Sequence, residues 1–478
     1  MRWTIAEVAS AVGARPGAGL NPVARVAGVS IDSRTIRPGE LFIAIHGPRH
    51  NGHDHVASAL DHEAMAAVVA EAQLGRYTEQ VRGGCIAVAD TFDALKQLAR
   101  AVRETWGRKI AGVTGSVGKT TTKEMLAALL GSRFQVLKSE GNFNNEYGLP
   151  LTLFRLEETH QAVVLEMGMS RRGELSRLAQ IARPDVGVVT RVAPAHLEFF
   201  GSVEEIALAK RELIEGLNGR DSVAVLNSDD PLVAAFASKA PGRVLTYGIE
   251  DAADFRAEGI EDRGALGSTF LVAAQGKRTR LELALAGRHL ISNALAALAA
   301  ASVWGIGAAE AQPIFRDLRA PAMRGELLRL DNGAAVINDS YNSSPAALRA
   351  MIHMLAQTPE FRRRILAAGE MRELGQTSAQ LHREAGAFAA KTGKIDWIVG
   401  VEGDAAQIVE GAVAAGLPRG RTKFFDSSEA AAGFLAGFIT PGDLLLVKGS
   451  RGVKMERIVE ALVARYAAGV ATAEKVQH

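Results

Sequence analysis

The sequence predicts an α/β protein with three domains, a small mixed α/β domain followed by two larger domains built on parallel sheets. At 478 residues the chain is too long for a single hydrophobic core. Short apolar runs alternate with helical patterns over most of its length. This alternation is typical of parallel strands whose two faces are covered by helices.

The first domain is expected over residues 1–84, where glycine and proline turns separate short elements. A helical pattern at Ile5–Val12 precedes strand-like runs at Val26–Ile31 and Leu41–Ile45. Frequent turns between short strands favour a small mixed α/β unit.

The central domain is expected over residues 85–318 and the C-terminal domain over residues 319–478, with a break at Arg319–Arg324. Before the break, a glycine-rich turn joins the first apolar strand to the helix Thr120–Leu130. The alternation of strands and helices resumes after it, which predicts a separate Rossmann-like, doubly wound sheet. The strands are expected at Lys109–Thr114, Ala162–Leu165, Val186–Val189 and Val223–Leu226, then at Ala334–Ile337, Ile365–Ala368, Ile395–Val399 and Leu444–Val447.

Composition argues against several classes of protein. The 55 Lys and Arg residues nearly balance the 53 Asp and Glu residues, and a net charge of +2 gives no reason to expect nucleic acid or an anionic membrane as a partner. No uncharged apolar run reaches membrane-spanning length, and Glu7 interrupts the N-terminus before a secretory signal can form. The single cysteine, Cys85, fits a reducing compartment. We therefore expect a cytoplasmic protein without membrane insertion.

A glycine-rich loop, Gly112-Val-Thr-Gly-Ser-Val-Gly-Lys-Thr120, separates a predicted strand from a predicted helix. Backbone N–H groups in such a turn bind phosphate oxygens, the lysine adds a positive charge, and the next hydroxyl can hold magnesium. Val113 stands where the usual spacing has a glycine, but the strand–loop–helix context is the one that a phosphate loop requires. The residues expected to bind ATP here are Gly115, Ser116, Val117, Gly118, Lys119, Thr120 and Thr121.

The loop alone leaves the chemistry open. A GTP-dependent switch would need a guanine-binding Asn-Lys-x-Asp segment, which the sequence lacks, and a dinucleotide site would leave Lys119 unexplained. A kinase for a small molecule and a non-catalytic, nucleotide-gated binding protein remain open beside an ATP-dependent ligase.

Two further features concern metal binding. Glu166 directly follows the strand Ala162–Leu165, so its carboxylate should lie at the carboxyl edge of the sheet, beside the phosphate loop, where it could bind magnesium. Four histidines between His46 and His55 could instead suggest zinc. Because glycine and proline interrupt this run and no cysteine accompanies it, a loop that contacts substrate is favoured.

The phosphate loop continues as Thr-Thr-Lys-Glu, and in this form it resembles the loop of the Mur ligases of peptidoglycan synthesis. Three segments are similar to the branch of the family that adds D-alanyl-D-alanine: Thr114–Lys119, Gly369–Gly375, and Lys448–Arg451 with Met455-Glu456 behind it. Ser343 and Ser344 depart from the family's usual Ala and Asn. The Asp-Asn-Pro-Arg segment of the branch that adds diaminopimelate or lysine is absent. Other segments that resemble the family are Asp32-Ser-Arg34, Pro38–Gly47, Gly141–Gly148, Glu166-Met-Gly168, Asn227–Asp230, Gly287–Asn293, Arg324-Gly-Glu326 and Asn338–Asn342.

The resemblance implies a reaction. ATP would phosphorylate the C-terminal carboxylate of UDP-N-acetylmuramoyl-tripeptide to an acyl phosphate, and the amine of D-alanyl-D-alanine would then displace phosphate. Two anions, ATP and the substrate carboxylate, must approach each other. Neutralisation of their charge by Lys119 and Mg²⁺ is therefore the main physical task. Whether the third residue of the tripeptide is lysine or diaminopimelate stays open, and a monomer is expected.

The resemblance also implies roles for single residues. Thr120 and Glu166 would bind one magnesium ion, and His196 with Lys210 a second. Lys210 would otherwise pass for a solvated helix lysine, but related ligases carry a lysine here that reacts with carbon dioxide to give an anionic carbamate, which can bind magnesium. The other implied contacts are adenine for Asn293, phosphate for Arg324, ribose for Asp339, the reacting groups for Asn142, the UDP part of the substrate for Ser33 and Arg34, and further substrate contacts for Asn145, Tyr341 and Asn342.

Overall fold

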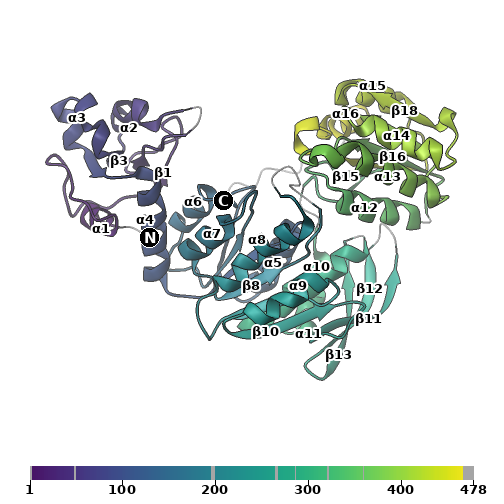
Figure 1. Cartoon of the computed structure of the whole chain (residues 1–478), viewed down its shortest axis with the longest axis horizontal. Coiled ribbons are helices and arrows are strands. Elements are labelled where there is room, and N and C mark those ends of the chain that lie inside the picture. The colour runs from purple at the N-terminus through teal and green to yellow at the C-terminus, as the bar shows by residue number, and fades with distance from the viewer. Residues whose placement is uncertain are drawn as a thin grey trace.

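Three sheets, each formed by a separate stretch of chain, give the molecule three lobes along its long axis (Figure 1). The computed structural model describes residues 3–47, 50–194, 200–263, 267–285, 287–319, 322–358 and 360–466. No helix within these ranges combines the length and the apolar character needed to cross a membrane. The predicted three-domain α/β class is confirmed.

The first sheet has four parallel strands in the order β1-β2-β3-β4. Its last strand, β4, begins at Cys85 and still pairs with β3, so the sheet runs past the predicted first boundary at residue 84. The division into 1–84, 85–318 and 319–478 stays a prediction, and its first boundary fits better in the helix that follows β4. The elements are α1 Ile5–Ala11, β1 Val29–Ser30, β2 Leu41–Ile43, α2 Val56–Asp61, β3 Ala66–Ala70, α3 Glu79–Gly83 and β4 Cys85–Val88.

The helix α4 (Thr91–Trp106) connects the first two lobes (Figure 1). Leu95 and Leu98, in its first half, pack into a core of the first sheet. Val102 and Trp106, in its second half, pack into a core of the central sheet. One continuous helix therefore contributes to two hydrophobic cores.

The central sheet has nine strands in the order β13-β12-β11-β10-β9-β8-β5-β7-β6. The strands from β5 to β10 form the predicted parallel sheet, although the sequence had predicted only β5, β7, β8 and β9 among them. Strands β11 to β13 add an antiparallel extension that the sequence did not predict. Helices α5, α10 and α11 cover one face, and α4, α6, α7 and α8 cover the other. The strands are β5 Ile110–Thr114, β6 Val136–Lys138, β7 Ala162–Glu166, β8 Val186–Val189, β9 Val223–Asn227, β10 Arg243–Gly248, β11 Phe255–Asp262, β12 Ser268–Ala274 and β13 Lys277–Leu283. The helices are α5 Lys119–Gly131, α6 Gly148–Phe154, α7 Glu174–Ala182, α8 Val203–Glu215, α9 Pro231–Ala234, α10 Arg288–Ala301 and α11 Ala308–Asp317.

The third sheet has six strands in the order β14-β15-β19-β16-β17-β18, all parallel except β14. Helices α12, α13 and α14 cover one face and α15 and α16 the other, which makes this sheet doubly wound. The strands are β14 Glu326–Arg329, β15 Ala335–Asp339, β16 Arg363–Gly369, β17 Trp397–Val401, β18 Thr422–Phe425 and β19 Asp443–Lys448. The helices are α12 Pro345–Gln357, α13 Ser378–Lys391, α14 Ala405–Ala414, α15 Ser428–Phe438 and α16 Glu456–Tyr466.

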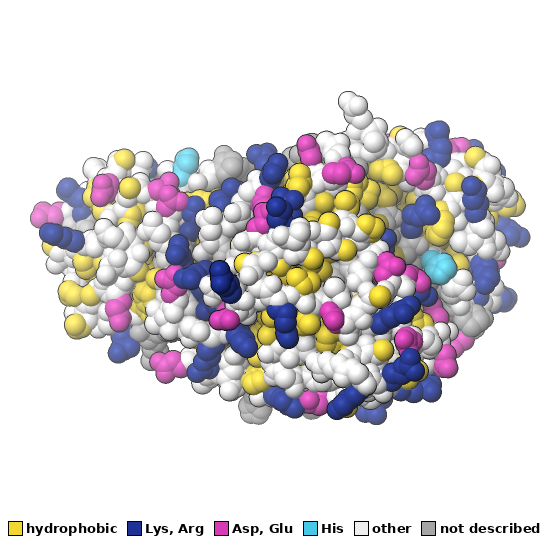
Figure 2. Space-filling model, turned by 60° about the horizontal axis from the view of Figure 1, so that its bottom comes forward, with side chains coloured by type: hydrophobic (Ala, Val, Ile, Leu, Met, Phe, Trp, Pro, Cys, Tyr) yellow, Lys and Arg dark blue, Asp and Glu magenta, His cyan; other side chains and the backbone are white. Residues whose placement is uncertain are grey.

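Charged side chains are mixed on the face of the molecule shown in Figure 2, where Lys and Arg are interspersed with Asp and Glu. This distribution agrees with the near balance of the two charge types in the sequence. A basic stripe of the kind that tracks a nucleic-acid backbone is not the pattern of this face.

Candidate active site

The phosphate loop lies between β5 and α5, as predicted. The structure explains why two positions in this loop are glycine. Gly118 has φ +86° at the start of α5, and a Cβ atom there would lie 2.5 Å from Oδ1 of Asn293 on α10. Gly115 has φ +149°, and its Cβ would lie 1.8 Å from Oγ1 of Thr190. Both positions therefore require glycine for conformation and for space.

Lys119 lies over this loop, where its Nζ donates a hydrogen bond to the Gly115 carbonyl at 2.8 Å. Burial lowers the pKa of Lys119, Glu166 raises it, and Arg324 lowers it again. Arg324 precedes β14 of the third sheet, so its effect on Lys119 shows that the third lobe approaches the loop. A phosphate group bound between these two cations would relieve their repulsion.

Glu166 is the last residue of β7, at the carboxyl edge of the sheet, and is only 3% exposed. Its Oε2 accepts a hydrogen bond from Thr120 Oγ1 at 2.6 Å, and its Oε1 accepts one from Asn144 Nδ2 at 2.9 Å. A buried carboxylate beside a hydroxyl is the kind of oxygen donor set that magnesium takes. The residues present therefore fit a magnesium ion next to the phosphates.

Lys210 on α8 is 2% exposed, so it is not a solvated helix lysine. Among the described residues, its ammonium has no hydrogen-bond or ion-pair partner. Burial lowers the pKa of Lys210 well below its ordinary value, and the charge on Lys119 lowers it further. The unprotonated amine is thereby favoured at this position. His196, its predicted partner, lies outside the described residues.

The asparagine-rich turn lies directly before α6, and the predicted roles of Asn142 and Asn145 stay predictions. Asn142 is exposed, and Asn145 uses its Oδ1 to accept hydrogen bonds from the Tyr147 and Gly148 N–H groups at 3.1 and 2.8 Å, which shapes the start of α6. The turn reaches Glu166 through Asn144 instead. Sequence reasoning missed Asn144 because three asparagines in one turn carry no periodic signal that separates them.

The third lobe presents its predicted residues at the carboxyl end of β15. Asp339 ends this strand and pairs through Oδ2 with Lys448 Nζ at 2.6 Å, and Lys448 also donates to the Asn342 carbonyl at 2.9 Å. The guanidinium of Arg324 lies 4.0 Å from the centre of the Tyr341 ring. The sequence analysis named Lys448 only as part of the segment Lys448–Arg451 and assigned no role to this buried partner.

This end of β15 faces α10 of the central lobe. His289 on α10 has its pKa lowered to about 4 by burial, against an opposing effect of Asp339. α10 also contacts α12 of the third lobe. Asn293, Asp339 and the phosphate loop thus surround one region between the central and third lobes.

The first lobe has a separate hollow of about 240 Å³, lined in part by His46, Asn51 and His53. Both ring nitrogens of His53 are used, because Nδ1 lies 2.9 Å from Asn51 Oδ1 and Nε2 accepts from the Ala70 N–H at 3.0 Å. The described ranges contain no cluster of three or more His, Cys, Asp or Glu side chains suited to a metal.

The predicted UDP contacts lie near the end of β1 in the same lobe. Arg34 is exposed, and its Nη2 lies 2.6 Å from Asp32 Oδ2. Hydrogen bonds from Arg34 lower the pKa of Asp32 to about 2. Asp32 therefore keeps its charge and holds the guanidinium in place, while Ser33 between them is half-buried. Their contact with a substrate stays a prediction.

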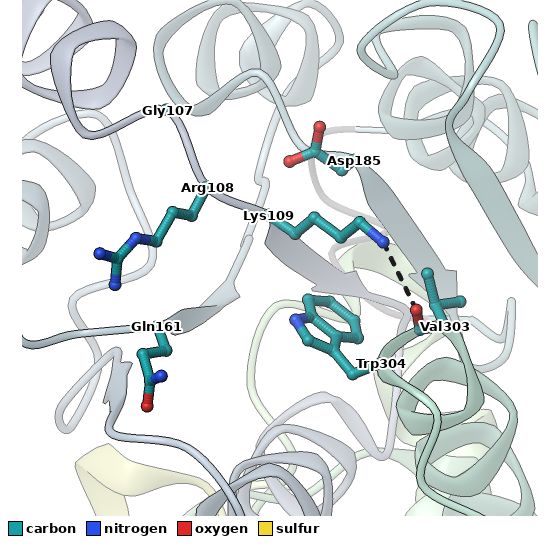
Figure 3. Close-up of a pocket in the computed structure, with 7 residues that line it drawn as sticks. All are labelled: Gly107, Arg108, Lys109, Gln161, Asp185, Val303 and Trp304. Carbon is teal, nitrogen blue, oxygen red and sulfur yellow. Dashed lines mark hydrogen bonds between the residues drawn. The ribbon is translucent and has the colours of Figure 1, made fainter.

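A larger hollow, of about 430 Å³, lies at the opposite, amino edge of the central sheet (Figure 3). Its charged side chains already have protein partners: Lys109 donates to the Val303 carbonyl at 3.5 Å, and Asp185 accepts from Arg103 at 2.9 Å. Ligands of open parallel sheets bind at the carboxyl edge instead. We therefore place the active site at the phosphate loop.

A glycine-rich loop between a parallel strand and a helix, with charged groups of a second lobe nearby, is typical of an enzyme that uses a nucleotide. Three family models match the chain: the Mur ligase family catalytic domain at residues 25–103, the Mur ligase middle domain at 113–301, and the Mur ligase glutamate ligase domain at 323–451. The chain belongs to the Mur ligase family of ATP-dependent peptide ligases.

Individual relatives resemble the chain over nearly its full length. The UDP-N-acetylmuramoyl-tripeptide–D-alanyl-D-alanine ligase of Bacillus subtilis (strain 168) is 36% identical over 436 residues, which cover 91% of this chain and 93% of that protein. The crystal structure of MurF from Acinetobacter baumannii matches with a TM-score of 0.88 and 28% identity, over 97% of this chain and 99% of its own. MurF from Thermotoga maritima in complex with ADP matches with a TM-score of 0.80 and 29% identity, over 92% and 97%.

Proposed function

We propose that this protein joins D-alanyl-D-alanine to the C-terminal carboxylate of UDP-N-acetylmuramoyl-tripeptide, converting ATP to ADP and phosphate in peptidoglycan precursor synthesis. The near-full-length similarity to ligases named for this reaction supports the substrates. The observation that carries the chemistry is the convergence of Lys119, Glu166 and the buried Lys210 at one edge of the central sheet. A monomeric state and a cytoplasmic location belong to the same proposal.

The residues of the loop bind and orient the nucleotide. Backbone N–H groups at the start of α5 hold phosphate oxygens, while Lys119 and Arg324 neutralise the charge that repels an incoming carboxylate. A magnesium ion, when held by Thr120 and Glu166, adds further neutralisation of the phosphates. The substrate carboxylate takes the terminal phosphoryl group to give an acyl phosphate and ADP. The D-alanyl-D-alanine amine then attacks the acyl carbon, its nitrogen gives up a proton, and phosphate leaves with the bonding electron pair.

The remaining contacts divide between the lobes. Asp339 uses Oδ2 for Lys448, and its Oδ1 accepts no hydrogen bond from the described residues, which leaves it available for a ribose hydroxyl. Asn293 lies beside the loop and is assigned to adenine. The first lobe holds the UDP part of the substrate through Ser33 and Arg34, far along the chain from the loop. His196 and a carbamylated Lys210 are assigned to a second magnesium ion.

Phosphate release from ATP tests the proposal. We expect release only when UDP-N-acetylmuramoyl-tripeptide and D-alanyl-D-alanine are both present with ATP and magnesium, together with an amide product detected by mass spectrometry. A stable phosphate ester formed from a single acceptor, in place of a labile acyl phosphate, would indicate a kinase. Nucleotide binding without turnover would indicate a nucleotide-gated binding protein.

Domain closure is a second expectation, because the proposed ATP contacts come from two lobes. Small-angle X-ray scattering should show a smaller radius of gyration after addition of a non-hydrolysable ATP analogue and the UDP-linked substrate. The Lys119→Ala protein, which lacks a main phosphate contact, should compact less. An unchanged scattering profile of the unmodified protein would contradict closure.

A further inference from the structure

Asn144 is held firmly beside the active site by the segment that follows β7. Its backbone carbonyl accepts a hydrogen bond from the Gly168 N–H at 2.8 Å. A Cβ atom on Gly168 would lie 3.0 Å from the Asn144 carboxamide, so the absence of a side chain at residue 168 gives this group its place. The turn before α6 therefore packs closely against the segment after β7 at Asn144.

The side chain of Asn144 completes a clamp on Glu166. Asn144 Nδ2 donates to Oε1 at 2.9 Å, and Thr120 Oγ1 donates to Oε2 at 2.6 Å. Two donors from different elements, one on each oxygen, fix the rotation of the carboxylate about its last bond. The backbone N–H of Glu166 is also fixed, because it donates to Ser139 Oγ at 3.1 Å.

Both side-chain donors in the clamp are neutral. An arginine or lysine at residue 144 would orient the carboxylate equally well but would cancel its charge and repel a metal ion. An amide orients it and leaves its negative charge available. Lys119, the nearby cation, makes its hydrogen bonds to the loop carbonyls of Gly115 and Ser116 and none to Glu166 among the described residues.

We propose that Asn144 is a positioning residue that presents the Glu166 carboxylate to the magnesium ion of the bound nucleotide. The inference rests on the magnesium site of the proposed function and assigns a role to a residue that does not itself touch ATP or the metal. Outer partners of metal ligands typically change metal affinity by about 10- to 100-fold. Asn144 should therefore affect nucleotide binding only when magnesium is present.

Isothermal titration of ADP into the full-length protein, once with magnesium and once with EDTA, tests this role. Asn144→Ala should leave the affinity for ADP in EDTA unchanged and should reduce the gain in affinity due to magnesium by roughly 10-fold or more. Gly168→Ala, which keeps Asn144 but displaces its carboxamide, should reduce the same gain to a smaller extent.

The matched control is Asn218→Ala. Asn218 also donates its amide to a carboxylate, Asp185 Oδ1 at 3.1 Å, but at the opposite edge of the sheet. It should leave the magnesium-dependent gain unchanged even if it lowers the melting temperature. The inference is wrong if Asn144→Ala and Gly168→Ala show the same magnesium-dependent gain in affinity for ADP as the unmodified protein. It is also wrong if both variants lose as much affinity for ADP in EDTA as they lose in magnesium.

This measurement is separate from the ligase assay. ADP and magnesium binding requires neither the UDP-linked substrate nor D-alanyl-D-alanine. A protein that forms no amide but shows the predicted loss in Asn144→Ala would refute the proposed function and keep the inference. An active ligase whose Asn144→Ala variant keeps the full magnesium-dependent gain would support the proposed function and refute the inference.

Discussion

Replacement of Lys119 by alanine is expected to lower kcat for amide formation by roughly 10²- to 10³-fold or more, or about 2.7–4 kcal/mol of transition-state stabilisation. Lys119 lies directly over the loop, so its charge is positioned for the phosphoryl group that is transferred. Its loss should also raise the pKa of Lys210, because Lys119 now lowers it. Steady-state kinetics with both substrates measure the effect.

Binding of the UDP-linked substrate should survive this change, because Ser33 and Arg34 belong to another lobe, and calorimetry can confirm it. Lys109→Ala is the matched control, since Lys109 directly precedes the same strand β5 but lies at the opposite edge of the sheet. That variant should keep nearly full activity. Retention of most activity by Lys119→Ala would refute the assignment of the phosphate loop.

Lys210→Ala is expected to lose activity by roughly 100-fold or more, about 2.7 kcal/mol. A lysine with an ordinary pKa is almost wholly protonated near neutral pH and cannot react with carbon dioxide. The pKa of Lys210 is lowered by burial, so a larger fraction is the free amine, whose nitrogen can add to the carbon of carbon dioxide and release a proton. The carbamate then carries a negative charge, which can bind magnesium.

Chemical rescue distinguishes this role from simple loss of packing. Acetate, a short carboxylate, should restore part of the activity of Lys210→Ala and should not stimulate the unmodified protein. Carbon-13 NMR with labelled bicarbonate should show a carbamate signal that Lys210→Ala lacks. Arg211→Ala is the control on the same helix, because Arg211 forms a part-exposed pair with Glu215 at 2.8 Å. A nearly fully active Lys210→Ala protein would contradict the prediction.

The buried parallel strands were predictable because their apolar runs are continuous, and Glu166 could be placed at the sheet edge because it directly ends such a run. The strands β11 and β13 were not predicted, since each carries four charged residues and lacks a continuous apolar run. The pair of Arg278 on β13 with Glu258 on β11 spans the strand between them, β12, and has no local signature in the sequence.

The burial of Lys210 could not be predicted from a sequence pattern either. Ala209 and Lys210 are both buried on α8, and the face that a helix turns toward a sheet depends on tertiary packing when charged residues lie within its apolar stripe. The contact of Asn144 with Glu166 joins residues 22 positions apart through two different elements. Only the resemblance to Mur ligases directed attention to Lys210, and in the turn it selected Asn142 and Asn145, not Asn144.

The helix α4 couples the unfolding of the first two lobes. The first half of α4 belongs to one hydrophobic core and the second half to another. Because both cores depend on the same helix, melting of one core also removes support from the other. The free energies of unfolding of the two lobes are therefore not independent, and heat should denature them together. A truncated protein that ends at residue 84 would lack β4 and the whole of α4, whereas one that ends after Trp106 would keep every strand of the first sheet and the helix that covers it.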